Sequence, residues 1–181
     1  LSSIPEVSTP EKFYEWKNNL ELPPREAFEN INGVINLMGE NIGDKRWDES
    51  QKKKLTESRV NSTTNIIKQI NETNLHLQFF ITASAIGIYP VNQLQVLDEN
   101  SSYAQSFLGE LCKNWEQPTR ELTSTCRVVI MRTGVVLDKT GGALKKMLPP
   151  FQMGLGGIIG DGKQMMSWID IDDLVNLYVT A

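Results

Sequence analysis

Three short apolar runs along the chain are separated by two stretches with helical periodicity. The runs at residues 31–37, 79–84 and 127–131 are rich in aliphatic and β-branched side chains, which is typical of buried strands. Residues 48–71 place apolar side chains three and four positions apart, which predicts a helix with one face on a sheet. The alternation of strands and helices predicts an α/β fold with one parallel sheet and helices on its faces.

The helix after the second run begins near Ser106 and is limited by Pro118. Its stripe of apolar residues, at helical spacing, predicts a core-facing side rather than a cofactor site. In the first helix, Asp48 is positioned to cap the first turn. Arg59 lies on the sheet-facing side, where a guanidinium needs partners. We favour a ligand-side or loop-anchoring role for Arg59 over an arginine that only reaches water.

The second run ends in small and hydroxyl-bearing residues. In an open parallel sheet, ligands lie outside the carboxyl ends of the strands. Thr82, Ser84 and Tyr89 are therefore predicted to lie where chemistry would occur. An ordinary core strand followed by a polar turn explains the same residues equally well. Gly39, just after the first run, allows another backbone or a flat ligand to approach, although a simple turn fits it too.

Residues 141–170 differ from the rest because glycine is frequent and apolar periodicity is weak. The segment 145–148 predicts a short helix that Pro149 and Pro150 stop. A loop as long as the one that follows, inside a compact domain, is typical of a lid or a binding loop. The carboxylates at 170–173 are predicted to cap a last helix. Capping alone accounts for Asp172 and Asp173.

Composition excludes several classes of function. The 181 residues suit one domain, with 40% hydrophobic and 22% charged residues and a net charge of -4, so there is no basic face for nucleic acid. Cys112, Cys126 and the single His76 lack metal-ligand spacing, so no metal site is predicted. Free thiols suit the reducing cytoplasm. No apolar run reaches the roughly 20 residues of a membrane span. Because the chain begins at Leu1 without Met and ends within a helical pattern, we expect a part of a longer protein.

Several runs, among them NLMGENIGDKRW, TASAIGIY and RTGVVLDKTGGALKKMLPPFQMGLGGIIGDGKQMMSWIDIDDL, resemble the epimerase-family branch of the short-chain dehydrogenase/reductases. The resemblance covers residues 31–181 in the same order. It implies a Rossmann-type doubly wound parallel sheet with helices on both faces and with NAD or NADP across the strand ends. It also implies a partial dinucleotide-binding domain at 1–137 and a Gly-rich substrate loop with a helix at 138–181.

The resemblance also assigns residues to roles. Ser84 takes the position of the catalytic hydroxyl, and Tyr89 is the nearby phenol. The residues it places beside the cofactor are Leu37, Met38, Gly39, Arg59, Thr82, Ala83, Arg132, Thr133 and Gly134. The residues it places on the substrate side are Phe151, Leu155, Gly156, Gly157, Gln164 and Trp168.

Two departures from the family pattern stand out. Active members pair a Tyr with a Lys four positions later, which lowers the tyrosine's pKa for proton exchange. The resemblance places Phe107 and Leu111 at those positions, and neither exchanges a proton. Tyr89 is followed four positions later by Gln93, which cannot supply the charge. The phosphate-binding glycine loop is also missing before Ile31.

These observations lead to two functional hypotheses. The first is an NAD(P)-dependent epimerase or oxidoreductase that transfers hydride to or from a sugar-nucleotide-like or other small hydroxylated substrate. Ser84 would hold the substrate oxygen and Tyr89 would serve as acid-base. The second is a dinucleotide-binding protein without turnover, with a sensor or structural role, motivated by Phe107 and Leu111. A homodimer formed through a helix face is a further expectation.

Overall fold

The computed structural model describes residues 12–17, 19–91, 96–158 and 160–181. The strands are β1 (Gly33–Asn36), β2 (Phe79–Ala85), β3 (Arg127–Thr133), β4 (Val135–Asp138) and β5 (Trp168–Asp170). The helices are α1 (Glu49–Glu72), α2 (Phe107–Glu116), α3 (Gly142–Gln152) and α4 (Ile171–Thr180), with short 3-10 turns η1 (Arg25–Phe28), η2 (Ile86–Ile88) and η3 (Gln117–Glu121).

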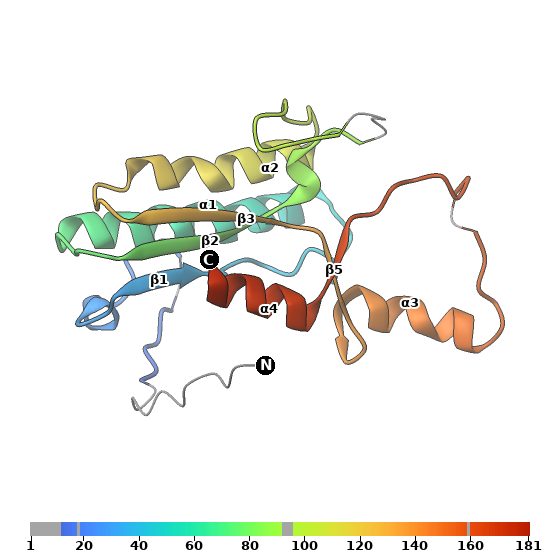
Figure 1. Cartoon of the computed structure of the whole chain (residues 1–181), viewed down its shortest axis with the longest axis horizontal. Coiled ribbons are helices and arrows are strands. Elements are labelled where there is room, and N and C mark those ends of the chain that lie inside the picture. Colours follow the sequence, from blue (N-terminus) through green and yellow to red (C-terminus); the bar gives the residue numbers. More distant parts are fainter. Residues whose placement is uncertain (1–11, 18, 92–95, 159) are drawn as a thin grey trace.

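The centre of the molecule is a three-stranded parallel sheet in the order β1-β2-β3 (Figure 1). Asn36 lies beside Thr82, and Ser84 lies beside Arg132, so the carboxyl ends of the strands meet at one edge. The predicted α/β fold with a parallel sheet is therefore confirmed. The predicted strand positions are correct, with the ends shifted by one or two residues.

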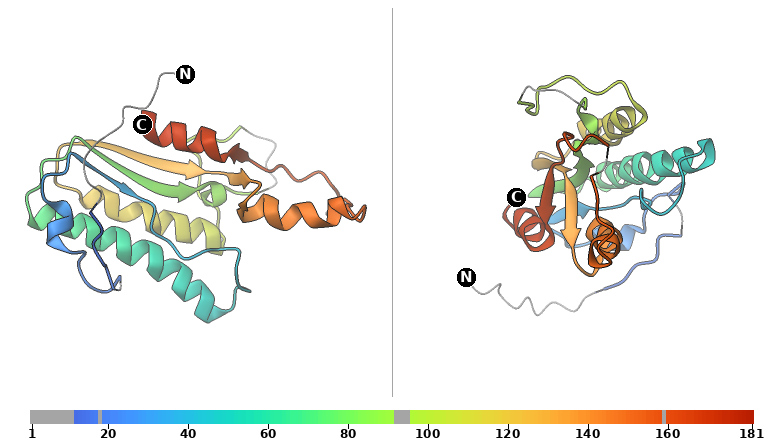
Figure 2. Two further views of the ribbon diagram at one scale, coloured as in Figure 1. Left: turned by 90° about the horizontal axis from the view of Figure 1, so that it is seen from below. Right: turned by 90° about the vertical axis from the view of Figure 1, so that its right-hand side faces the viewer.

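Helices α1 and α2 cover one face of the sheet (Figure 2). Ile66, Ile67 and Ile70 of α1 form the core cluster with Phe80 of β2, because their spacing brings them onto one side of the helix. Asp48 caps α1 as predicted, since its carboxylate accepts a hydrogen bond from the Gln51 amide at 2.7 Å.

Helix α4 lies against the opposite face (Figure 2). Burial of the Tyr178 ring on α4 raises the pKa of its phenol, and the nearby Thr133 side chain of β3 opposes that rise. Asp170 caps this helix through the Asp172 amide at 2.9 Å. Helices therefore lie on both faces of the sheet, as predicted.

The prediction that Pro149 and Pro150 stop a helix is wrong, because α3 continues through both residues to Gln152. A proline lacks the amide hydrogen but keeps a helical φ and a carbonyl acceptor. The Pro149 carbonyl accepts from the Met153 amide at 3.1 Å. The hydrogen bonds that the two prolines cannot make would end on Lys145 and Lys146, which are exposed to water.

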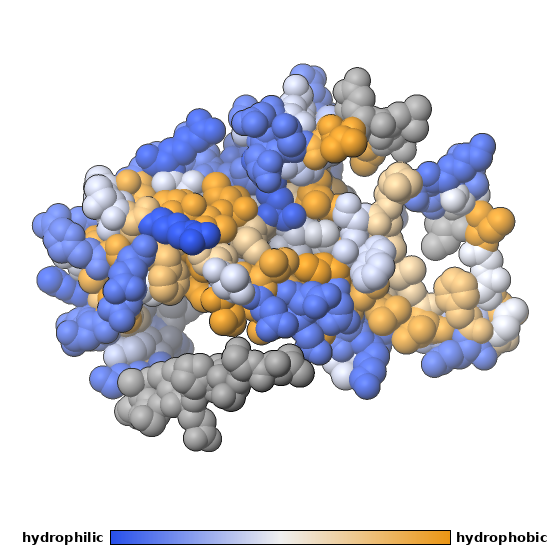
Figure 3. All heavy atoms as spheres, in the orientation of Figure 1, coloured by the Kyte–Doolittle hydropathy of each residue, from blue (hydrophilic) through white to orange (hydrophobic). Residues whose placement is uncertain are grey.

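A second, two-stranded sheet of β4 and β5 was not predicted. It begins where the Val135 amide donates to the Ser167 carbonyl at 2.8 Å. Beyond it, α3 and the glycine-rich segment project away from the central sheet as an arm (Figure 1). Hydrophobic side chains lie on the surface of this arm (Figure 3), among them Phe151 at 57% and Met153 at 66% exposure.

None of the helices in the described part of the chain combines the length and the apolar character needed to cross a bilayer.

Candidate functional site

A buried polar cluster lies where β2 and β3 end. The Ser84 hydroxyl donates to Oε1 of Glu116 at 2.6 Å. Arg132 donates to the same carboxylate twice, from Nε to Oε1 at 2.9 Å and from Nη2 to Oε2 at 2.8 Å. The Arg132 and Glu116 side chains are only 15% and 10% exposed. This two-pronged geometry is the strong form of an arginine–carboxylate pair.

The sequence builds this cluster from local rules. The parallel register of β2 and β3 sets Ser84 beside Arg132. Glu116 follows Cys112 by four positions, so its carboxylate lies on the core-facing side of α2. The hydrogen bonds that Arg132 donates to Glu116 raise the pKa of its guanidinium, which stays charged. Each buried charge is thus compensated by its partner.

Tyr89 joins this cluster through its hydroxyl. Nη1 of Arg132 donates to the Tyr89 oxygen at 2.8 Å and to the Glu99 carbonyl at 3.2 Å. The guanidinium also lies 5.3 Å from the centre of the Tyr89 ring. A positive charge therefore sits beside the phenol, supplied by the neighbouring strand. The position four residues after Tyr89, Gln93, lies outside the described residues.

Arg59 anchors the segment after β1. Its Nη2 donates to the Glu40 carbonyl at 2.9 Å, and its Nη1 donates to the Leu55 carbonyl at 3.1 Å. The guanidinium lies 5.1 Å from the centre of the Trp115 ring, and burial lowers the pKa of Arg59. A Cβ on Gly39 would lie 3.0 Å from Cζ of Arg59, so the glycine makes room for this side chain.

The glycine after β3 has a comparable explanation. A Cβ on Gly134 would lie 2.7 Å from the Ser167 carbonyl oxygen, so the glycine lets the backbone of the β5 segment approach. Gly39, Ser84 and Gly134 all lie at the carboxyl ends of the three parallel strands. The two glycines, however, contact protein atoms there.

The other residues predicted beside the cofactor have different environments. Leu37 and Met38 are 64% and 44% exposed at the end of β1. Thr82 is fully buried and its hydroxyl accepts from the side-chain Nδ2 of Asn36 at 3.2 Å, while Ala83 is half-buried on the other face of β2. The structure therefore leaves the end of β1 open and closes the end of β2 with a polar core.

Phe107 and Leu111, at the positions of the family's Tyr and Lys, lie on α2. The Phe107 ring meets Trp47 edge-on, with 5.8 Å between ring centres. Leu111 is 3% exposed, so it belongs to the apolar interior. The next residue, Cys112, is buried as well, and burial raises the pKa of its thiol so that it stays neutral.

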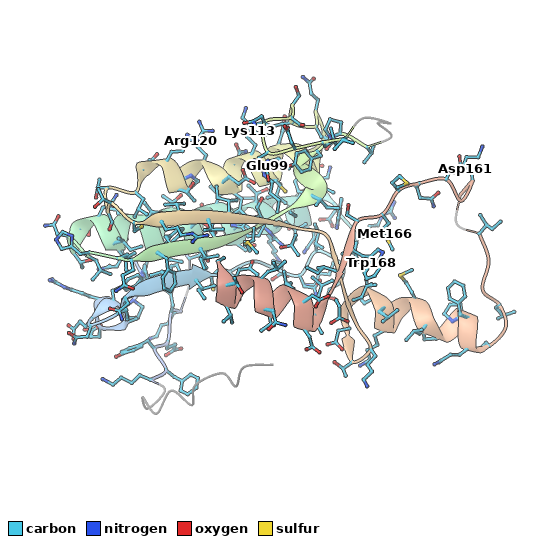
Figure 4. The ribbon with its side chains drawn as sticks, in the orientation of Figure 1. Glu99, Lys113, Arg120, Asp161, Met166 and Trp168 are labelled. Carbon is cyan, nitrogen blue, oxygen red and sulfur yellow. The ribbon has the colours of Figure 1, made fainter. Side chains whose placement is uncertain are left out.

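Of the predicted substrate-side residues, Trp168 lies near the cluster. A cavity of about 670 Å³ is lined by Trp168, Gly134, Thr133, Arg132 and Tyr89, among others. Figure 4 shows Trp168 on β5 and Glu99 near α2, and both residues line this cavity. By contrast, the remaining predicted substrate-side residues belong to the projecting arm: Phe151, Leu155, Gly156, Gly157 and Gln164.

Two polar residues of this region were missed by the sequence analysis. Glu116 connects Ser84 to Arg132, and the signal for it was a carboxylate on the apolar stripe of α2. Asn36 is 2% exposed and donates to the Thr63 hydroxyl at 2.9 Å, which ties β1 to α1. A polar residue inside an apolar strand run was its signal.

The parallel sheet, its covering helices and the polar cluster at the strand ends define a Rossmann-type α/β protein. Residues 24–181 match the sequence profile of the NAD dependent epimerase/dehydratase family. The chain belongs to that family.

Relatives give the same assignment. The chloroplastic epimerase family protein SDR39U1 homolog of Arabidopsis thaliana is 38% identical over 169 residues, covering 92% of this chain and 46% of the relative. An epimerase family protein of Mycobacterium tuberculosis is 41% identical over 150 residues, covering 82% of this chain and 49% of the relative. The chain thus spans about half the length of these curated relatives.

Solved structures share the fold. The human epimerase family protein SDR39U1, solved with NADPH, aligns with a TM-score of 0.77 at 34% identity, covering 82% of this chain and 52% of that one. A nucleoside-diphosphate sugar epimerase from Corynebacterium glutamicum aligns with a TM-score of 0.77 at 32% identity, covering 92% and 34% of the two chains. A UDP-glucuronic acid 4-epimerase from Bacillus cereus, at 17% identity and a TM-score of 0.73, shares the fold alone.

Proposed function

We propose that this chain is part of an NAD(P)-dependent, epimerase-like oxidoreductase acting on a small hydroxylated or carbonyl substrate. The observation that carries the proposal is the contact between the Arg132 guanidinium and the Tyr89 hydroxyl at 2.8 Å. It provides a phenol with an adjacent positive charge although the usual Tyr-Lys pair is absent. The human relative solved with NADPH supports the choice of cofactor.

The residues at the strand ends fit a dinucleotide in part. Exposed Leu37 and Met38 leave an apolar strip at the end of β1, which suits a flat adenosine. Arg132, Thr133 and Gly134 line the cavity beside Tyr89, where a nicotinamide would lie against the same edge. Within the described part of the chain, no glycine loop follows a strand to hold the pyrophosphate. When bound, the cofactor would accept or supply a hydride at a substrate carbon.

The protein's own residues would handle the proton. Tyr89 accepts a hydrogen bond from Arg132, so its own proton is available to a substrate oxygen. The guanidinium stabilises the negative charge that develops on the phenol oxygen when this proton leaves. In the reverse direction, Tyr89 takes the proton of the substrate hydroxyl. Glu116 fixes the guanidinium by two hydrogen bonds and orients Ser84, whose oxygen would accept a hydrogen bond from a substrate hydroxyl.

A second candidate function is dinucleotide binding without turnover. Two observations favour it. Phe107 is packed against Trp47, and Leu111 is enclosed in the core. The two positions of the usual acid-base pair therefore carry side chains that cannot exchange a proton. In addition, the Ser84 hydroxyl already donates to Glu116 and offers a substrate only its lone pairs.

Three further expectations stay predictions: a division of the chain near residue 137, a cytoplasmic location and a homodimer. The boundary of the first falls within β4, in the second sheet that begins at Val135. The second rests on two cysteines without a disulfide, Cys112 and Cys126.

The proposal is tested on the intact protein in two steps. Binding of NADPH or NADH is measured as a rise in melting temperature. Turnover is then followed by nicotinamide absorbance with a series of alcohols and carbonyl compounds. Tyr89→Phe should lower turnover by about a hundredfold or more, because it removes the exchangeable proton, while leaving cofactor binding intact. Ser84→Ala should also reduce turnover, by loosening the hold on the substrate oxygen.

Tyr14→Phe is the matched control, because it removes a phenol from a tyrosine that is 42% exposed and away from the cluster. Turnover that is unchanged in both Tyr89→Phe and Ser84→Ala would remove the assigned roles. A shift in melting temperature without turnover of any compound would favour the binding protein.

A further inference from the structure

An apolar hollow lies beside the candidate acid-base. Its volume is about 710 Å³, and its lining includes the rings of Trp47, Tyr89 and Phe107 together with Ile86 and Leu108. Ile86 and Tyr89 also line the cavity that contains Arg132, so the two spaces share a wall. The hollow therefore lies next to the proposed chemistry, and Tyr89 of the polar cluster belongs to both linings.

Three polar side chains around this hollow, Trp47, Tyr89 and Ser106, already make a hydrogen bond within the protein. The Trp47 indole nitrogen donates to the Ile42 carbonyl at 2.9 Å, and the Tyr89 oxygen accepts from Arg132. The Ser106 hydroxyl accepts from the Gly109 amide at 3.2 Å. Gln105 is exposed to solvent. A sugar ring placed here would lose water at its hydroxyl groups and gain few replacements, which costs free energy.

The aromatic walls instead suit a flat apolar group. Trp47 and Phe107 meet edge-on, and both rings remain partly exposed, so a third ring can pack against them. A volume of about 710 Å³ lies within the usual range for small-molecule pockets. Phe107 is central to this wall, and it stands where the resemblance expects a hydroxyl.

We propose that this hollow selects a substrate with a planar, apolar ring system that carries the reacting carbonyl or hydroxyl, rather than a nucleotide sugar. The reaction of this substrate rests on the proposed function, whereas its binding in the hollow does not. The ring system packs against the exposed parts of the Trp47 and Phe107 rings, and the oxygen lies toward Tyr89.

The test measures binding and turnover separately in the intact protein. The probe is acetylnaphthalene, a planar ketone, and the competitor is UDP-glucose. Binding is followed by saturation-transfer NMR on the probe. Trp47→Ala and Phe107→Ala should each weaken binding of the ketone by about tenfold, because each removes a stacking surface. Trp47→Phe keeps an apolar ring and should retain most of the affinity.

Phe13→Ala is the matched control, since this phenylalanine is 90% exposed and does not line the hollow. Binding of UDP-glucose in place of the ketone, or ketone binding that ignores Trp47 and Phe107, would overturn the inference. Oxidation of NADPH with the ketone is recorded in parallel. Ketone binding without NADPH oxidation would count against the proposed reaction and leave the ring-binding hollow supported.

Discussion

The guanidinium of Arg132 connects β3 to three residues at and after the end of β2: Ser84 through Glu116, Tyr89 directly, and Glu99 through its carbonyl. Arginine suits this position because its planar fork can serve a carboxylate and a phenol at the same time. A lysine donates from a single nitrogen, so it lacks the parallel two-nitrogen contact that Arg132 makes with the Glu116 carboxylate. The electrostatics beside Tyr89 therefore depend on the pairing of Arg132 with Glu116.

At this scale, Glu116→Ala is expected to lower the free energy of unfolding by about 3 kcal/mol, because it leaves the Arg132 charge largely buried without its partner. Urea unfolding of the variant and the wild type measures the difference. Glu57→Ala is the control, since its pair with Lys53 spans 3.7 Å between partly exposed side chains. The control should change stability by less than about 0.5 kcal/mol. Equal losses of unfolding free energy in the two variants would show that the buried pair stabilises the protein no more than the exposed pair does.

At the scale of elements, the periodic helices and the apolar strands could be predicted because their patterns express one buried face. Asp48 and Ser106 mark the starts of α1 and α2, since each side chain accepts from a backbone amide of the first turn. Helix α3 departed from expectation. Its two prolines remove backbone hydrogen bonds on a solvent-exposed side of the helix. The rule that proline ends a helix does not take into account that water can replace the missing donor.

The double variant with Pro149→Ala and Pro150→Ala should slow amide exchange in α3 by about tenfold or more, because it restores two backbone hydrogen bonds where a proline costs roughly 3 kcal/mol. Hydrogen-exchange mass spectrometry of the segment measures this. Lys145→Ala, in the same helix, restores no hydrogen bond and serves as the control. Exchange rates that match those of wild type in the double variant would mean that the prolines do not limit the helix.

At the scale of the whole molecule, the central sheet and the two-stranded sheet meet at Gly134. A Cβ on Gly134 would lie 2.7 Å from the Ser167 carbonyl oxygen, and backbone atoms cannot rotate away as a flexible side chain can. The meeting point also borders the cavity that contains Arg132 and Trp168. Packing here therefore connects the projecting part of the chain to the candidate site.

Gly134→Ala should destabilise the protein by about 1–3 kcal/mol, as overpacking in a close contact does. Thermal unfolding measures the loss. Gly141→Ala is the control, because a Cβ there would meet nothing within 4 Å and its φ of -154° is open to any residue. If Gly134→Ala has the same melting temperature as Gly141→Ala, the two sheets can separate at this point at little cost in free energy.

The sequence alone determined the α/β fold, the positions of three strands and the capped helices, because each depends on periodicity and on contacts within a few residues. The family resemblance likewise placed Ser84 and Tyr89 near one edge. The ion pair of Arg132 with Glu116, and its contact with Tyr89, came only from the tertiary structure. These side chains belong to separate elements, and only the register of β2 with β3 and the packing of α2 bring their charges together.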